Sequence, residues 1–369
     1  MVTLDRDAQI RVVPFDPSYL PVVRQFAARY WSRPTSDEYY TWRYLDALPI
    51  GRLFMAIQEG ECLGMAYGLR RSYLVNQVLT DCLEVFDWHV LPGLKGSGVG
   101  IRVMRALMRQ PERLIAVGGT QDVQSALPKM GWQRIGTARK YELRLSGTLV
   151  ARAVEDRLRV PARWTARPLD VAAKFWFGPR LRTAPADHTV QMTPMLGTEI
   201  DELYDRNRYG FTQRPLLPVF KWFSHSSLAN GVFCYLRFYE GGRLVGWTLS
   251  RAYDTSEGRE GAILDAYSPE PNPGRYAWMI SHAVSALAGF RPRIIRTRAS
   301  CDAFKAALLE NRFREQDVDV PVHTWPKGVE LTGPLHVTLN HSDEPLRPYI
   351  SAGTSEGQPG AEAMATPEG

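Results

Sequence analysis

The chain has 369 residues, of which 44% are hydrophobic and 23% are charged, a composition typical of globular proteins and not of disordered ones. It contains no run of about 18 apolar residues and no basic region followed by an apolar core near its start, so neither a membrane span nor a secretory leader is expected. The predicted location is therefore the cytoplasm. The four cysteines lie far apart with no C-x-x-C pair, which excludes a disulfide scaffold and predicts no metal site.

The hydrophobic pattern of the first half predicts strands that alternate with helices. In chain order these are a strand at Ile10–Val13, helices at Tyr19–Tyr30 and Asp37–Leu45, a hairpin at Leu53–Leu69, a strand at Asp81–Val90, a helix at Gly100–Arg109, a strand at Leu114–Val117, a short helix at Val123–Lys129 and a strand ending near Leu145. This order predicts an α/β (α+β) fold, in which a mixed central sheet is flanked by helices.

The second half repeats the order. Ala56 to Met65 reads AIQEGECLGM and Phe238 to Trp247 reads FYEGGRLVGW, so Gly60 aligns with Gly242 and Gly64 with Gly246. A helix at Tyr276–Ala288, a strand at Arg293–Thr297 and a helix at Asp302–Glu310 follow in the second half. The repetition at about half the chain length predicts a duplicated α/β unit.

Between the halves lies a basic segment. From 150 to 185 there are eight basic and three acidic residues, a local net charge of +5 out of +6 for the whole chain. Aromatic residues stand among these charges, so the segment could contact an anionic membrane surface. The favoured interpretation is a solvated linker helix that packs its aromatic residues on a neighbouring domain, because the charges have no regular helical face. No nucleic-acid-binding motif accompanies it, and no nucleic acid partner is predicted.

The most informative stretch runs from Val90 to Ile101 and reads VLPGLKGSGVGI, between a strand and a helix. Glycines allow a sharp turn and a close approach to the backbone N–H groups, and the N-terminus of the following helix carries partial positive charge. Such a loop binds phosphates. The spacing fits neither the dinucleotide fingerprint nor the Walker pattern.

The loop fits the pattern V-x-P-x-x-[RQ]-G-x-G-x-G, with Lys95 at the position of the usual Arg or Gln. On these residues, and on the element order from about Ile10 to Leu145, the chain resembles the GNAT superfamily of N-acyltransferases. The resemblance implies that an acyl-coenzyme A such as acetyl-CoA is the co-substrate. It places the coenzyme A pyrophosphate and pantetheine on His89, Val90, Lys95, Gly96, Ser97, Gly98, Val99, Gly100 and Ile101.

The resemblance and the duplication imply a domain plan: a GNAT-like catalytic domain at 1–148, the basic linker at 149–188 and a degenerate GNAT-like domain at 189–349. The end of the chain is rich in Gly, Ser, Ala, Pro and Glu, which predicts a disordered tail at 350–369. In the second copy, Ser268 to Arg275 reads SPEPNPGR at the position of the glycine loop. Its three prolines remove backbone donors and Glu270 would repel a pyrophosphate, so this copy is not expected to bind coenzyme A.

The implied chemistry is attack by an amine on a thioester, which needs a base. Glu84, eight residues before Pro92, stands where the histone-acetylating branch of the family has its general base, and Asp87 is the rival. His89 is a third candidate. The tyrosine that commonly serves as the acid in this family is replaced by Leu127, so Tyr141 or water could supply the proton instead.

The acceptor is expected to be a small-molecule primary amine. Six aromatic residues (Tyr30, Trp31, Tyr39, Tyr40, Trp42 and Tyr44) crowd the region that covers the acceptor in this family. They favour an amino sugar or polysaccharide precursor, although a packed core helix has the same spacing. Two functions stay open: an N-acetyltransferase, or a non-catalytic acyl-CoA-binding or interaction protein on the same fold. The oligomeric state is not predicted.

Overall fold

The structure is a computed structural model that describes residues 9–31, 36–145, 187–226, 228, 231–342 and 346. The predicted linker at 149–188, except for its last two residues, and the predicted tail at 350–369 lie outside the described residues. Among the described helices, none is long and apolar enough to cross a membrane.

The elements of the first half agree with the predicted order. They are β1 (Arg11–Pro14), α1 (Leu20–Trp31), α2 (Asp37–Tyr40) continued by a turn of π-helix at Thr41–Leu45, β2 (Gly51–Gln58), β3 (Glu61–Val75), β4 (Val78–Val90), α3 (Val99–Met108), β5 (Arg113–Val117), α4 (Gln121–Lys129) and β6 (Gln133–Arg144). Ser36 and Thr120 cap α2 and α4 by accepting bonds from Tyr39 N and Val123 N.

The second half contains the same series. It comprises β7 (His188–Thr193), α7 (Asp201–Asp205), β8 (Phe211–Arg214), α8 (Leu217–Ser224), β9 (Val232–Glu240), β10 (Arg243–Thr255), β11 (Gly258–Tyr267), α9 (Pro273–Ala288), β12 (Ile294–Ala299), α10 (Asp302–Glu310), β13 (Arg314–Trp325) and β14 (Leu335–His336). The strands β8 and β14 have no counterpart in the first half. The predicted duplication and fold class are confirmed.

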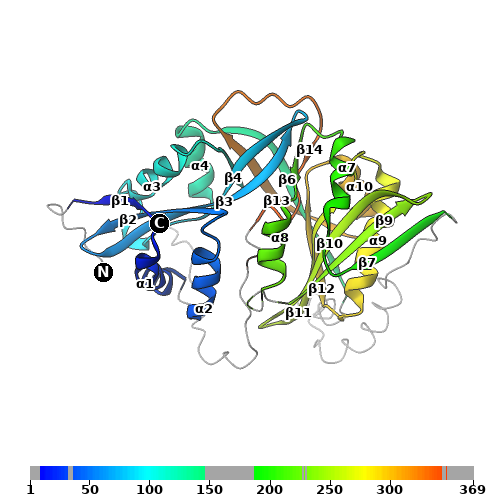
Figure 1. The fold of residues 1–369 in the computed structure, drawn as a ribbon, viewed down its shortest axis with the longest axis horizontal. Helices are drawn as coiled ribbons and strands as arrows, with labels where there is room; N and C mark the ends of the chain where they lie inside the picture. The colour runs from blue at the N-terminus through cyan, green and yellow to red at the C-terminus, as the bar shows by residue number, and fades with distance from the viewer. Residues whose placement is uncertain are drawn as a thin grey trace, which may run out of the picture.

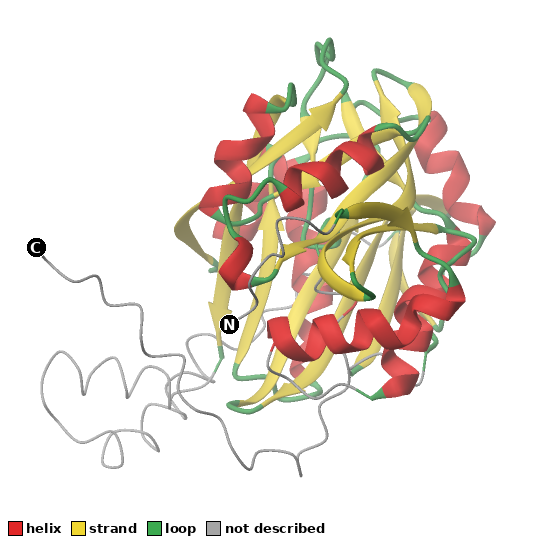
Figure 2. Cartoon of the chain, turned by 90° about the vertical axis from the view of Figure 1, so that its left-hand side faces the viewer, coloured by secondary structure: helices red, strands yellow, loops and turns green. Residues whose placement is uncertain are grey.

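All these strands belong to one mixed sheet (Figure 1). Within the described residues its main order is β1-β2-β3-β4-β5-β13-β6-β12-β11-β10-β9-β7. Figure 2 shows helices on both sides of the strands. In the first half, α1 and α2 lie on one side of β1 to β3, and α3 and α4 on the other (Figure 1).

The two halves exchange their last strands at the centre of the sheet. β13 of the second half pairs with β5, where Val322 faces Val117, and β6 of the first half pairs with β12, where Thr297 faces Tyr141. β6 and β13 also pair with each other. Each half therefore completes the sheet of the other. The extra strand β8 adds a further tie because it pairs with residues 72–75 of β3.

Strand β4 is the element that shapes the site. It pairs with β5 in parallel only from Cys82 to Glu84, and the two strands then separate. On its other edge, next to β3, the register shifts so that Asp87 and Trp88 oppose a single residue. Asp87 has φ of +46°, a left-handed conformation that Asp tolerates better than most residues. The segment from Val85 to Val90 thus has one edge open beside β5.

Candidate active site

The glycine loop after β4 presents backbone donors to open space. Gly96 and Gly98 have φ of +82° and +83°, a region where only glycine is unstrained. A Cβ on either residue would meet no atom within 4 Å. Among the described residues no hydrogen bond is recorded for the amides of Gly96, Gly98, Gly100 and Ile101. These donors, at the N-terminus of α3, form a cradle suited to a phosphate group.

The start of α3 is held against β4 by close packing. A Cβ on Gly100 would lie 2.9 Å from Val90 Cγ2, and the indole N–H of Trp88 donates to the Gly100 carbonyl over 2.9 Å. Gly64 of β3 is equally tight, because a Cβ there would lie 3.0 Å from the His89 carbonyl oxygen. This packing aligns the cradle with the open edge of β4.

Lys95 lies at the rim of the cradle and is largely exposed. Its Nζ lies 3.6 Å from Asp122 Oδ2 at the start of α4. Because both side chains are exposed, this pair contributes little to stability. Lys95 can therefore turn toward an anionic ligand with little loss of free energy from breaking its pair with Asp122.

Glu84 is buried at the point where β4 and β5 separate. Its side chain is 1% exposed and its Oε2 lies 3.3 Å from Nε of Arg71 on β3, which is 0% exposed. A Cβ on Gly68 of β3 would lie 3.1 Å from Leu83 Cβ and 3.2 Å from Leu107 Cδ1 of α3, so Leu83 is on the face of the sheet that α3 covers. Strand alternation then places Glu84 on the opposite face. The Arg71 guanidinium lies 5.9 Å from the ring centroid of Phe223 on α8. Glu84 therefore faces the second half of the molecule.

Burial raises the pKa of Glu84 to about 7, although the positive charges of Arg71 and Arg298 oppose this shift. At neutral pH the carboxyl is thus divided between its acidic and basic forms, as proton transfer requires. No nitrogen of the Arg71 guanidinium makes a hydrogen bond of good geometry with the described residues. These nitrogens are fully buried, and their closest charged partner is the Glu84 carboxylate.

Asp265 of β11 supplies a second buried carboxyl from the other half. It is 3% exposed, and burial raises its pKa to about 7. Hydrogen bonds from Thr338, Ala266 and Asn340 act in the opposite direction and lower its pKa. Its negative charge also raises the pKa of Glu84, so the two groups interact. His341 completes this polar region, and burial keeps its pKa well below the usual value. The polar core between the halves therefore contains two carboxyls poised near neutrality.

Asp87 is held in a different environment. Its Oδ2 accepts bonds from Arg43 Nε and Nη2 over 3.0 and 2.7 Å, and from the Tyr44 hydroxyl over 2.9 Å. Burial alone would raise the pKa of Asp87, but the positive charge of Arg43 lowers it below the usual value. His89 lies nearby, 3.8 Å from Asp87 Oδ1, with its ring packed 4.4 Å from that of Tyr30. Asp87 is thus an ionised anchor for Arg43.

Neither position considered for the general acid offers a hydroxyl group that is free to protonate the thiolate. Leu127 on α4 is fully buried in the core and offers no proton. Tyr141 on β6 donates to Glu315 Oε2 of β13 over 2.6 Å, and burial raises its pKa above the usual value. The tyrosine hydroxyl is therefore engaged at the exchanged strands.

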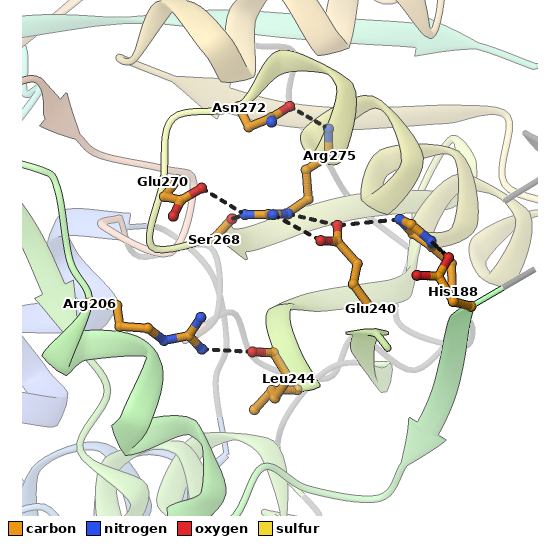
Figure 3. A network of polar contacts seen from close by, with 9 residues as sticks. His188, Arg206, Glu240, Leu244, Ser268, Glu270, Asn272 and Arg275 are labelled. Carbon is orange, nitrogen blue, oxygen red and sulfur yellow. Dashed lines mark hydrogen bonds and ion pairs between the residues drawn. The ribbon is translucent and has the colours of Figure 1, made fainter. Parts of the chain in front are cut away.

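The loop of the second copy is filled by its own side chains (Figure 3). Arg275, near the start of α9, donates to both oxygens of Glu240 over 2.9 Å. It also reaches Ser268 Oγ over 3.3 Å and Glu270 over 3.4 Å. In this loop the amides of Asn272 and Arg275 already donate to Glu270 O and Asn272 Oδ1, and the three prolines have no N–H, which agrees with the expectation that this copy lacks a phosphate cradle.

The aromatic residues that were expected to cover the acceptor mostly pack in the core. Tyr40, Trp42 and Tyr44 are each at most 4% exposed. Trp42 stacks on Trp222 of α8 with ring centroids 4.9 Å apart, and each indole N–H donates to the other residue's carbonyl over 3.1 Å. These rings join the two halves of the chain, and no open sugar platform is visible among them. The side chain of Trp31 lies outside the described residues.

Two of the site residues were not found from the sequence. Arg71 was not predicted as a site residue. The pair Arg70–Arg71 in an otherwise apolar strand does indicate a buried arginine, because the side chains of a strand alternate and one of the two must point inward. Arg43 was hidden in the aromatic helix. In the part of the chain that the structure describes, no group of three His, Cys, Asp or Glu side chains could hold a metal ion.

No protein-family model and no curated protein matches the sequence. Solved structures do match the fold. A GCN5-related N-acetyltransferase from Anabaena variabilis is 11% identical, with a TM-score of 0.57 over 86% of this chain and 72% of the other. A conserved protein of unknown function from Enterococcus faecalis, described as a probable N-acyltransferase, is 8% identical, with a TM-score of 0.53 over 86% and 72%.

N-myristoyltransferase of Saccharomyces cerevisiae, solved with bound myristoyl-CoA, is 10% identical to the chain. Its TM-score is 0.57 over 88% of this chain and 83% of the other. At these identities the likeness establishes the fold alone. The chain has the GNAT fold in tandem, as its loop and element order predicted.

Proposed function

We propose that this protein is an acyl-CoA-dependent N-acyltransferase that moves an acyl group from coenzyme A to a primary amine. The observation that carries the proposal is the cradle at Gly96 to Ile101, next to the open edge of β4, with the buried Glu84 at the vertex where β4 and β5 separate. The likeness to N-acyltransferase structures supports it.

In the proposed mechanism, the cradle amides and Lys95 bind the pyrophosphate, and the backbone of His89 and Val90 positions the pantetheine arm. Glu84 accepts the proton of the acceptor ammonium, directly or through water. The amine nitrogen then bonds to the thioester carbonyl carbon and the carbon–sulfur bond breaks. The coenzyme A thiolate leaves and takes up the second proton that the nitrogen loses, directly or through water. Arg71 positions Glu84 and favours its ionised form.

We further propose which acyl-CoA is the donor and which kind of amine is the acceptor. We propose an acetyl group as the acyl group, and acetyl-CoA is the first donor to test. An amino sugar or other polysaccharide precursor is the proposed acceptor. Of the aromatic residues that suggested it, Tyr30 and Tyr39 are the partly exposed ones with described side chains. A cytoplasmic location and a membrane contact through the basic linker remain proposals.

The domain plan also remains a proposal, with one addition from the fold. The segments 1–148 and 189–349 correspond to the two copies, but each contributes a central strand to the other. We propose that they fold and work as a single unit, in which the second copy forms a wall of the acceptor site through Asp265.

The proposal is tested by mixing the purified chain with acetyl-CoA, longer acyl-CoAs and a panel of amines, and measuring the free thiol released. Release that depends on the amine is expected, together with an N-acylated product by mass spectrometry. Tight binding of acyl-CoA without release under all conditions would instead identify a non-catalytic acyl-CoA-binding protein. The absence of both binding and release would overturn the proposal.

Substitution of Gly98 by alanine is expected to weaken binding of coenzyme A by about 10- to 100-fold, which corresponds to the loss of one or two charge-assisted hydrogen bonds. The new methyl group would occupy the open space in front of the amides. Calorimetric titration with coenzyme A measures the change.

Gly60→Ala is the matched control. Gly60 also has φ of +82°, and a Cβ there would likewise meet no atom within 4 Å, but it lies in the turn between β2 and β3. Both variants carry the same backbone strain, so a difference between them reports the ligand site. Equal affinities for coenzyme A in the two variants would show that the loop does not hold the pyrophosphate.

A further inference from the structure

A hollow of about 410 Å³ lies along the outer flank of α3. Its lining residues come from β1, β2, α3 and the two residues after α3, and they are Val12, Phe54, Arg102, Arg105, Ala106, Arg109 and Gln110. The volume lies in the range of sites that hold small ligands. We call this hollow the arginine groove.

The three arginines share one face of the helix. Their spacings of three and four residues put them in a row, and the row spans about 10 Å along the axis. All three side chains are exposed, and among the described residues no ion pair or hydrogen bond is recorded for any of them. By contrast, many other arginines of the chain, such as Arg43 and Arg275, are paired with carboxylates.

The helix itself does not account for this row. α3 contains no acidic residue, so the like charges at 102, 105 and 109 repel one another without compensation. Arg109 follows the last turn, where a positive charge is favourable, but Arg102 lies near the N-terminus, where the helix dipole disfavours it. A bound anion would remove both unfavourable terms.

The groove is separate from the donor cradle. Its lining joins α3 to β1 and β2, whereas the cradle lies at the N-terminus of α3, beside the edge of β4 that separates from β5. The cradle consists of backbone amides, whereas the groove consists of guanidinium groups over an apolar floor of Val12 and Phe54. The two sites share α3 but differ in position and chemistry.

We propose that the arginine groove is a second anion site, which binds a ligand with two or more phosphate groups. A guanidinium fork matches phosphate oxygens in a bidentate manner, and three forks in a row match a chain of phosphates better than a single carboxylate. The apolar floor suits a ring or chain attached to the phosphates. We take this ligand to be a free molecule that carries a chain of phosphates. Occupation of the groove by the single 3′-phosphate of the coenzyme A donor is an outcome of the test that would contradict the proposal.

The probe for the test is inorganic tripolyphosphate, added to the full chain by equilibrium dialysis at low salt. The cradle is first saturated with coenzyme A or with dephospho-coenzyme A, so that the probe reports the groove. If both complexes bind the probe, the natural ligand is a free molecule. If the dephospho complex binds it and the coenzyme A complex does not, the donor's own phosphate fills the groove, which contradicts the proposal.

Arg105→Glu is expected to weaken probe binding at least 10-fold, because it removes the central fork and reverses its charge. Arg105→Lys keeps the charge but loses the bidentate fork, so we expect a loss of affinity that is smaller than that of Arg105→Glu. Arg243→Glu is the control, since Arg243 is an exposed arginine at the start of β10 with no recorded ion pair.

The proposal is overturned if neither complex binds the probe, or if Arg105→Glu and Arg243→Glu weaken it equally. Because Arg105 is exposed, its substitution should not unfold the chain, and an unchanged thermal midpoint verifies this. If coenzyme A itself fails to bind, the titration is repeated on the free chain with Gly98→Ala, so that failure of the proposed function stays distinct from failure of the groove.

Discussion

Replacing Glu84 by glutamine is expected to lower kcat/KM for acyl transfer by about 10²- to 10⁴-fold, the range that a positioned general base contributes. Glutamine keeps the size of the side chain and cannot accept the amine's proton. Because the pKa of Glu84 is about 7, the native enzyme should gain activity as pH rises from about 6 to about 8, when the carboxyl becomes ionised. This ionisation should vanish from the pH profile of the variant.

The matched control is Glu112→Gln. Glu112 is also a buried glutamate beside an arginine, with its Oε1 3.4 Å from Arg70 Nη2, but it lies outside the open edge of β4. Its substitution should leave kcat/KM and the pH profile within a few-fold of the native values. An unchanged pH profile in Glu84→Gln would exclude Glu84 as the base, and Asp265→Asn would then be the next variant to measure.

Glu84 should also affect how the free energy of unfolding depends on pH. Its pKa is about 7 in the folded chain and near 4.5 when exposed. The folded state therefore binds more protons between these values, so this group favours folding below about pH 4.5 and loses that contribution as pH rises through 7. Glu84→Gln should remove this part of the pH dependence of the unfolding free energy, whether or not the residue takes part in catalysis.

Asp87→Ala is expected to lower the free energy of unfolding by about 3 to 5 kcal/mol, because it leaves the Arg43 guanidinium buried without its carboxylate. The alanine must also adopt φ of +46°, which adds strain that aspartate and asparagine tolerate. Asp87→Asn should therefore be milder. Urea unfolding followed by circular dichroism measures both changes.

Asp254→Ala is the control for an exposed ion pair. Asp254 and Arg259 lie 2.8 Å apart with about half of each side chain exposed, so the loss should be at most about 1 kcal/mol. If Asp87→Ala were no more harmful than Asp254→Ala, Asp87 would not be the anchor described above. A folded Asp87→Asn variant without turnover, beside an active Glu84→Gln, would move the role of base to Asp87.

The strongest sequence signals were local ones. The run from Val90 to Ile101 predicted a strand, a glycine turn and a helix, and the structure contains them with Gly96 and Gly98 at positive φ. The helix at Asp302–Glu310 has the same bounds in both. These elements depend on turn chemistry and on periodic apolar residues, and both can be read within a short window of sequence.

Other features needed contacts between distant residues. The exchange of β6 and β13 could not be predicted, because either half offers a similar edge strand to β5 and to β12, and local patterns do not distinguish them. The pairing of Asp87 with Arg43 joins residues 44 positions apart. The aromatic run from Tyr39 to Tyr44 was compatible with both a sugar site and a core, and only the packing on Trp222 decided between them.

The sequence by itself thus determined the tandem α/β architecture and the places of the glycine loop and of its proline-rich counterpart, because glycine and proline act through their own backbone geometry. The tertiary structure decided the state of the acidic residues. Glu84 and Asp87 are three positions apart on one strand, yet burial raises the pKa of the first and an arginine from another element lowers that of the second. The pKa of a carboxyl depends on its surroundings in space, which the neighbouring letters of the sequence do not specify.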